Sequence, residues 1–232
     1  MKYDTPLESE QEHLDDSVIS NHAKRTFQKV ALNALVVAAL AIFVNLCLRI
    51  DFSQFHHGLG ETSFTESAQL LMLAITSLSF FHLVKVKSSV HYAAVLMGGF
   101  FAVLFIREMD VWFDMLAHGS WVYPALAITL FSCYLAYTGG KQTFNQMAAL
   151  LSTRYMPVLI TSVVILLVFT RLYGMGSFWQ SVMGDNYLRE IKNVSEEATE
   201  LMAYSLIAFA AIKTNLLVTR ADALGQDDDS AK

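Results

Sequence analysis

Four charged residues that follow the third long apolar segment have types and a spacing that could do chemistry. They recur at i, i+3, i+7 and i+11, and so share one face if the helix continues beyond the segment: Arg107, Asp110, Asp114 and His118. Carboxylates with an imidazole bind a divalent metal such as zinc, and a coordination position left open on that metal would activate water for hydrolysis. Glu108 lies beside this stripe. The pattern therefore indicates a metal site or a neutralised helix end.

Two other apolar segments begin with acidic residues at a similar depth. Glu66 and Gln69 share a face at the start of the second segment. Glu196 and Glu200 share one at the start of the last segment, with Glu197 beside them. Helix capping accounts for acids in a first turn, because they accept hydrogen bonds from free N–H groups and complement the helix dipole. Glu200 lies one turn further in, where capping does not explain it.

The candidate functional cluster consists of the polar residues at these three helix ends: Glu66, Gln69, Arg107, Glu108, Asp110, Asp114, His118, Glu196, Glu197 and Glu200. Five of them are candidate metal ligands: Glu108, Asp110, Asp114, His118 and Glu200. Partly buried carboxylates also serve as proton or cation sites in transporters, so the residue types leave both chemistries open. Joining three helix ends requires a packing that the sequence does not show, and no residue is assigned a catalytic role.

The elements that must position this cluster are long apolar segments. Of the 232 residues, 54% are hydrophobic, 16% are charged and three are proline, which is typical of a polytopic membrane protein. A helix needs roughly 20 apolar residues to cross the hydrocarbon core of a bilayer. Six segments are close to that length: 30–48, 66–84, 90–108, 120–138, 156–173 and 199–217. The sequence therefore predicts an all-α, polytopic integral membrane protein with a six-transmembrane-helix bundle over 24–217.

The charged residues of the flanks predict the orientation of the bundle, because Lys and Arg are retained on the cytoplasmic side. With both termini inside, the inner flanks carry nine basic residues and the outer flanks five. The same arrangement places all eleven acidic residues outside the two tails on the outer face. The expected topology is therefore N-in/C-in, with every acid of the candidate cluster outside.

The segments beyond the spans differ in character. The tails 1–23 and 218–232 are acidic, and we expect the first to be disordered and neither to need a fold. Segment 141–155 has Phe144, Met147 and Leu151 at helical spacing, which predicts an amphipathic helix at the inner interface or a helix that caps the bundle. A net charge of −5 argues against a nucleic-acid partner.

Three stretches resemble a loose group of bacterial polytopic inner-membrane proteins to which no activity is assigned. They are ETSFTESAQLLMLAITSL at the start of the second segment, FIREMD with its R-E-x-D motif after the third, and SEEATELMAYSLIAFAAI at the start of the last. Helices led by Glu and an acidic motif after the third helix recur in that group. The resemblance implies a multi-pass protein of the bacterial cytoplasmic (inner) membrane, and it implies no particular activity.

Three functions are compatible with this sequence. The leading hypothesis is an inner-membrane protein whose outer-face acidic and histidine cluster binds a partner, an ion or a metal. The alternatives are a metal-dependent hydrolase acting on a lipid or lipid-linked substrate at the outer leaflet, and a transporter of a small solute or an ion. The expected partners are the lipid bilayer and a membrane protein or a second copy of the chain. Whether the protein is an enzyme is left open.

Overall fold

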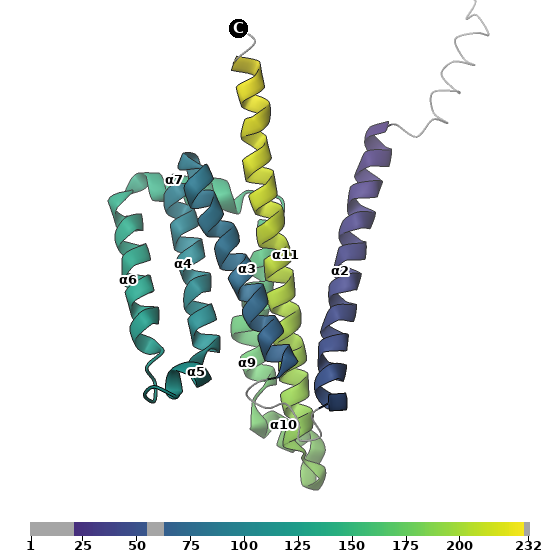
Figure 1. The fold of residues 1–232 in the computed structure, drawn as a ribbon. Helices are drawn as coiled ribbons and strands as arrows, with labels where there is room; N and C mark the ends of the chain where they lie inside the picture. Colours follow the sequence, from purple (N-terminus) through teal and green to yellow (C-terminus); the bar gives the residue numbers. More distant parts are fainter. Residues whose placement is uncertain (1–20, 55–62, 230–232) are drawn as a thin grey trace, which may run out of the picture. The chain divides into compact units, whose positions relative to one another are not determined.

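The protein is helical, without a strand, over the residues that the structure describes. The structure is a computed structural model that describes residues 21–54 and 63–229, the last nine of them as backbone only. The longer helices are α2 (Asn21–Gln54), α3 (Phe64–Val86), α4 (His91–Glu108), α6 (Val122–Thr138), α7 (Lys141–Leu151), α8 (Met156–Val164) and α11 (Arg189–Asp229) (Figure 1). The shorter elements are η1 (Ser88–Val90), α5 (Asp110–Asp114), the π-helical turn η2 (Ile165–Phe169), α9 (Thr170–Tyr173), α10 (Gly176–Met183) and η3 (Gly184–Asn186).

Five helical stretches of the described chain are long and apolar enough to cross a membrane: Ala23–Ser53, Phe64–Val86, Ser88–Glu108, Met156–Tyr173 and Arg189–Arg220. Helix α6 has 17 residues and meets α7 at a bend of 106°, and counting this bent pair as one span raises the number to six. Each of the six predicted segments overlaps one of these helices. The all-helical fold is therefore confirmed, with five to six helices long enough to span a membrane.

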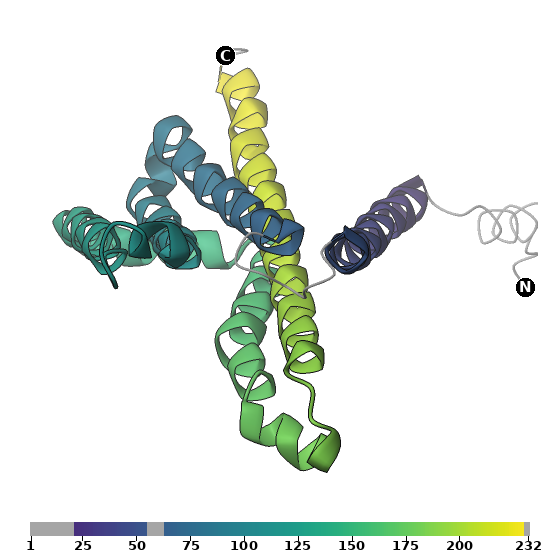
Figure 2. The same cartoon turned by 60° about the horizontal axis from the view of Figure 1, so that its bottom comes forward.

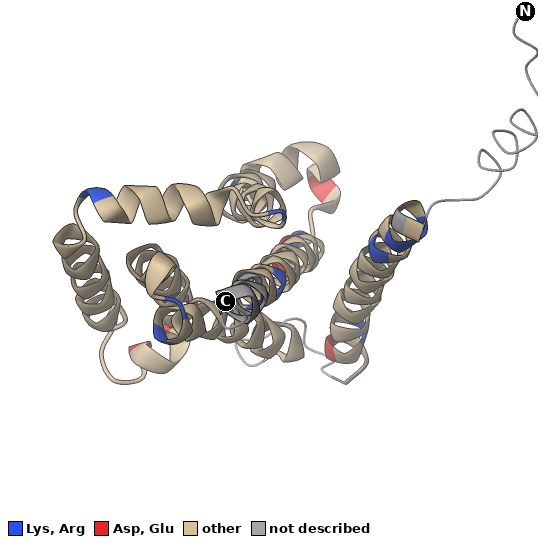
Figure 3. Cartoon of the chain, turned by 90° about the horizontal axis from the view of Figure 1, so that it is seen from above, with Lys and Arg blue, Asp and Glu red and all other residues tan. Residues whose placement is uncertain are grey.

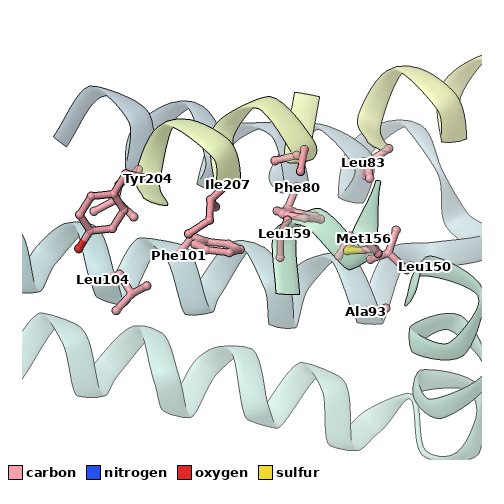
Figure 4. Close-up of a cluster of buried hydrophobic side chains, with 14 of the residues drawn as sticks. Phe80, Leu83, Ala93, Phe101, Leu104, Leu150, Met156, Leu159, Tyr204 and Ile207 are labelled. Atoms are coloured by element: carbon pink, nitrogen blue, oxygen red, sulfur yellow. The ribbon is translucent and has the colours of Figure 1, made fainter. Parts of the chain in front are cut away.

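Helix α3 packs against both α4 and α11, and these three helices supply most of the core (Figures 1 and 2). Phe80 of α3 stacks on Phe101 of α4 with ring centroids 5.8 Å apart, and both side chains are buried. Leu159 of α8 and Ile207 of α11 complete this layer (Figure 4). Because lipid tails are as apolar as these side chains, close-packed dispersion contacts hold such helices together in a membrane.

The helix surfaces that face away from this core are apolar. On α6, Leu130, Phe131 and Tyr134 are 61%, 62% and 64% exposed. Figure 3 shows few charged residues along the lengths of the helices. Exposed apolar faces of this extent suit a hydrocarbon surrounding, since a water-soluble helix would carry polar residues there.

The chain divides into two units, Met1–Ala41 and Ile42–Lys232. In the first unit the described residues from Asn21 onward form the beginning of α2. In the second unit the last turns of α2 pack through Val44 and Cys47 against Ala68 of α3 and Leu201 of α11. The end of α2 thus belongs with the core of the bundle.

Helix α7 occupies most of the segment for which we predicted an amphipathic or a capping helix. Its Gln146 is buried, accepts a hydrogen bond from the backbone N–H of Tyr92 at 2.8 Å and donates one to the carbonyl of Ser88 at 3.3 Å. Gln146 therefore caps the start of α4, where helical N–H groups lack partners. Phe144 of the same helix is 80% exposed, so α7 caps the bundle with one face and leaves an aromatic side chain on another.

The two predicted tails lie largely beyond the described side chains. Residues 1–20 are outside the described chain. At the other end the backbone of α11 continues as a helix to Asp229, past residue 217 where the sequence predicted the last span to end.

Candidate functional site

The described acidic residues between positions 63 and 220 lie at one end of the bundle, the end that α5 and α10 occupy in Figure 1. Helices α3 and α11 begin there, and α4 and α9 end there. We call this the acidic end. Glu61, which the sequence also assigns to this end, lies outside the described residues. Grouping the acids at one end confines their chemistry to a single face of the bundle.

Asp51, near the end of α2, fixes the start of α3. Its carboxylate accepts hydrogen bonds from the backbone N–H groups of Phe64 and Thr65 at 2.7 and 2.9 Å, and from the hydroxyl of Thr65. Ser63 completes the cap by accepting from the N–H of Glu66 at 3.1 Å. The side chain of Asp51 is buried. The start of α3 is therefore held by a residue from another helix, which orients the side chains that follow.

Gln69 joins α3 to α11. It is 2% exposed, and its Nε2 donates a hydrogen bond to Oε2 of Glu197 at 2.7 Å. Glu66 lies one turn before Gln69 and repels Glu197 electrostatically, as does Glu108 of α4. The sequence placed Glu66 and Gln69 on one face, and the structure brings that face against Glu197.

Glu108, the last residue of α4, links α4 to α11. The hydroxyl of Tyr204 on α11 donates a hydrogen bond to Oε1 of Glu108 at 2.7 Å, and Arg107 approaches the same oxygen at 3.3 Å. Figure 4 shows the Tyr204 hydroxyl reaching from α11 toward α4. Glu108 therefore accepts a hydrogen bond from a neutral hydroxyl and pairs with one guanidinium group. Glu197 and Glu200 repel it electrostatically.

Glu200 and Glu196 contact α9 and the glycine that follows it. Glu200 is buried, and its Oε1 lies 3.7 Å from the guanidinium of Arg171 on α9. Glu196 forms an ion pair with Lys192 at 2.6 Å, and its carboxylate lies against Gly174, where a Cβ would collide with it. Gly174 therefore permits the close approach of α11 to the end of α9, and Glu196 is neutralised within its own helix.

A cavity of about 180 Å³ opens among these residues, between α3, α4, α5 and α11. We call it the acidic pocket. Its lining contains four acidic residues, one amide and one indole: Glu66, Glu108, Asp110, Glu197, Gln69 and Trp112. Arg107 pairs with one of these acids, Glu108. The lining residues include four carboxyl groups and no basic side chain.

The stripe after α4 does not stay on one face. The helix breaks at Met109, whose N–H is shared among three preceding carbonyls, and α5 is only five residues long. Asp110 lines the acidic pocket, whereas Asp114 pairs with His118 at 3.0 Å and does not line it. His118 is 98% exposed. Asp114, at the end of α5, and His118, on the loop that follows, therefore form a surface pair.

The five candidate metal ligands are not gathered into one site. Among the described residues, no group of three or more His, Cys, Asp or Glu side chains is placed to hold a metal ion. The break at Met109 contributes to this, because Asp114 and His118 follow it and pair with each other on the surface, whereas Glu108 lines the acidic pocket. Zinc binding stays a prediction of the sequence that this geometry does not support.

Some residues that shape the acidic end were not predicted from the sequence. Neither Trp112, which lines the pocket, nor Tyr204, which donates a hydrogen bond to Glu108, is among the candidate residues of the sequence. The partner of Tyr204 lies 96 residues away in the sequence, so spacing could not reveal it. Asp51 and Arg171 likewise act through residues of other helices.

Comparison of the chain with models of protein families, with curated proteins and with solved structures found no significant match in any of the three.

Proposed function

We propose that this chain is a multi-pass protein of the bacterial inner membrane, with both termini inside, whose acidic pocket on the outer face binds a small cation. The single observation that carries the proposal is the enclosure of Glu66, Glu108, Asp110 and Glu197 around one cavity. Carboxylates that share a partly enclosed site repel one another, and a bound cation relieves that repulsion.

The charge balance of the pocket favours a cationic ligand. Arg107 pairs with Glu108, and Glu197 receives only a neutral amide hydrogen from Gln69. Lys192 is engaged by Glu196, outside the pocket lining. At about 6 Å and an effective dielectric constant of about 20 to 40, one carboxylate attracts a unit charge by about 1.4 to 2.8 kcal/mol. Several carboxylates around one cavity therefore make a site of useful affinity.

The size and lining of the pocket favour a small organic ammonium ion over a directly coordinated metal. Its volume of about 180 Å³ corresponds to several water molecules, since one occupies about 30 Å³ in the liquid. Trp112 lines the pocket, and an indole ring attracts an ammonium group. The described side chains offer no compact group of three metal ligands.

The fluorescence of Trp112 tests this function. The purified full chain in detergent micelles is titrated with putrescine, a diammonium ion, at constant ionic strength. We expect a saturable change in fluorescence that is absent from Trp112→Phe. Glu197→Gln should weaken the apparent affinity between about tenfold and a hundredfold, from the Coulomb energy of one lost charge.

The matched control is Glu190→Gln, because Glu190 is an exposed acid at the start of the same helix and does not line the pocket. It should leave the affinity unchanged. A titration without a saturable signal would contradict the proposed function, and so would an equal loss in Glu190→Gln and Glu197→Gln. Calcium chloride is the comparison ligand, and a stronger response to calcium than to putrescine would replace the ammonium ion by a hydrated metal.

A further inference from the structure

A second cavity lies toward the opposite end of the bundle, between the later turns of α3 and the later half of α11. It has a volume of about 350 Å³. Its lining includes exposed apolar side chains, among them Leu78 and Ile212, and a polar pair formed by His82 and Asn215. We call this cavity the inner groove. It combines an apolar wall with a hydrogen-bonding site one to two turns before the end of α3.

The polar pair is held in one hydrogen-bonding arrangement. Nδ2 of Asn215 donates to the carbonyl oxygen of Ser79 at 2.5 Å and lies 3.2 Å from Nδ1 of His82. An amide nitrogen only donates, so Nδ1 of His82 accepts, and the neutral ring carries its hydrogen on Nε2. Since His82 is exposed, this Nε2–H group is available to an acceptor in the groove.

The surroundings of the inner groove are basic. Lys85 follows His82 by three residues on α3, and Arg220 follows Leu216 by four on α11, so each continues a face that lines the groove. Both side chains are exposed. No acidic residue described between positions 63 and 220 lies at this end. The two exposed basic side chains, Lys85 and Arg220, are therefore complementary to an anion bound in the groove.

We propose that the inner groove binds an anionic phospholipid, with an acyl chain along Leu78 and Ile212 and the phosphate near His82, Lys85 and Arg220. The proposal depends on the helices spanning a membrane and is independent of the acidic pocket. Basic sites between transmembrane helices on the cytoplasmic side attract acidic headgroups. The Nε2–H of His82 supplies a donor for a phosphate oxygen, and the two cations select a lipid with net negative charge over a zwitterionic one.

Native mass spectrometry of the full chain in detergent tests this proposal. Dioleoylphosphatidylglycerol and dioleoylphosphatidylcholine are titrated separately, and we expect the first to bind more tightly. Lys85→Gln and Arg220→Gln should each weaken binding of phosphatidylglycerol about fivefold, the factor that one basic side chain contributes near an anionic surface. The matched control is Lys141→Gln, which removes an exposed charge at the same end, at the junction of α6 and α7, and should leave the affinity unchanged.

A second variant tests the groove without changing its charge. Leu78 is 66% exposed, so Leu78→Trp fills the groove without disturbing the core, and we expect it to weaken the binding of both lipids. Equal affinity for the two lipids would overturn the proposal, and so would an equal loss of phosphatidylglycerol binding in Lys141→Gln. The proposal would also be overturned if the chain were a dimer, and if Leu78→Trp dissociated that dimer without changing the affinity for phosphatidylglycerol. The groove would then be the binding site for a second copy of the chain.

Discussion

Substitution of Asp51 tests whether one helix of this bundle orients the next. Its buried carboxylate accepts three hydrogen bonds at the start of α3, from two backbone N–H groups and the hydroxyl of Thr65. At about 1 kcal/mol for each lost hydrogen bond, Asp51→Ala should lower the free energy of unfolding by about 3 kcal/mol. Asp51→Asn keeps one acceptor oxygen and should cost about half as much.

The assay is unfolding of the purified chain in mixed micelles of increasing dodecyl sulfate content, followed by far-ultraviolet circular dichroism. Asp110→Ala is the control, because Asp110 is an exposed acid at the same end that accepts one hydrogen bond, from the N–H of its neighbour Val111. We expect it to change the unfolding free energy by less than about 0.5 kcal/mol. An effect of Asp51→Ala as small as that of Asp110→Ala would refute the proposed capping of α3 by α2.

Three further substitutions probe contacts between the helices. Gly99→Ala should destabilise the chain by about 1 to 3 kcal/mol, because the added Cβ would collide with the side chain of Ser132, and Ser132→Gly should restore most of that loss. Gln146→Ala should cost about 2 kcal/mol by uncapping α4, whereas Gln142→Ala, at an exposed position of the same helix, should cost almost nothing. Tyr204→Phe should lower stability by about 1 kcal/mol through the lost hydrogen bond to the partly buried Glu108. The same denaturation measurement checks all three.

The helices were predictable because length and hydropathy are local properties of the sequence. Segments 66–84 and 90–108 differ from α3 and α4 by no more than two residues at either end. The start of α11 was placed ten residues too late, at 199 instead of Arg189. Its first turns are polar, and the i,i+4 ion pair of Lys192 with Glu196 supports the helix there without any apolar signal.

The acidic site was predictable only in part, because its geometry depends on how helices pack. The prediction grouped Glu66, Glu108 and Glu197 because each lies near a helix end on the same side of the spans, and all three line the acidic pocket. The i+7 and i+11 spacing of Asp114 and His118 failed, because it assumed a helix that the break at Met109 interrupts. No local sequence pattern predicts this break, which separates the end of α4 from the start of α5.

The long-range hydrogen bonds could not be predicted from the sequence. The contacts of Gln69 with Glu197 and of Tyr204 with Glu108 join residues 128 and 96 positions apart. A buried polar group needs a partner in a low-dielectric interior, so the need for such contacts is predictable, but the identity of the partner follows only from the packing.

The central claim is that the bundle crosses a membrane with its acidic end outside and its basic end inside. Labelling of single cysteines with a membrane-impermeant maleimide on intact cells tests it most directly, after both native cysteines are replaced by alanine. Asp114 and Lys141 are exposed residues at the two ends. We expect Asp114→Cys to be labelled on intact cells and Lys141→Cys to be labelled only after permeabilisation. Labelling of both positions on intact cells, or of Lys141→Cys alone, would contradict it.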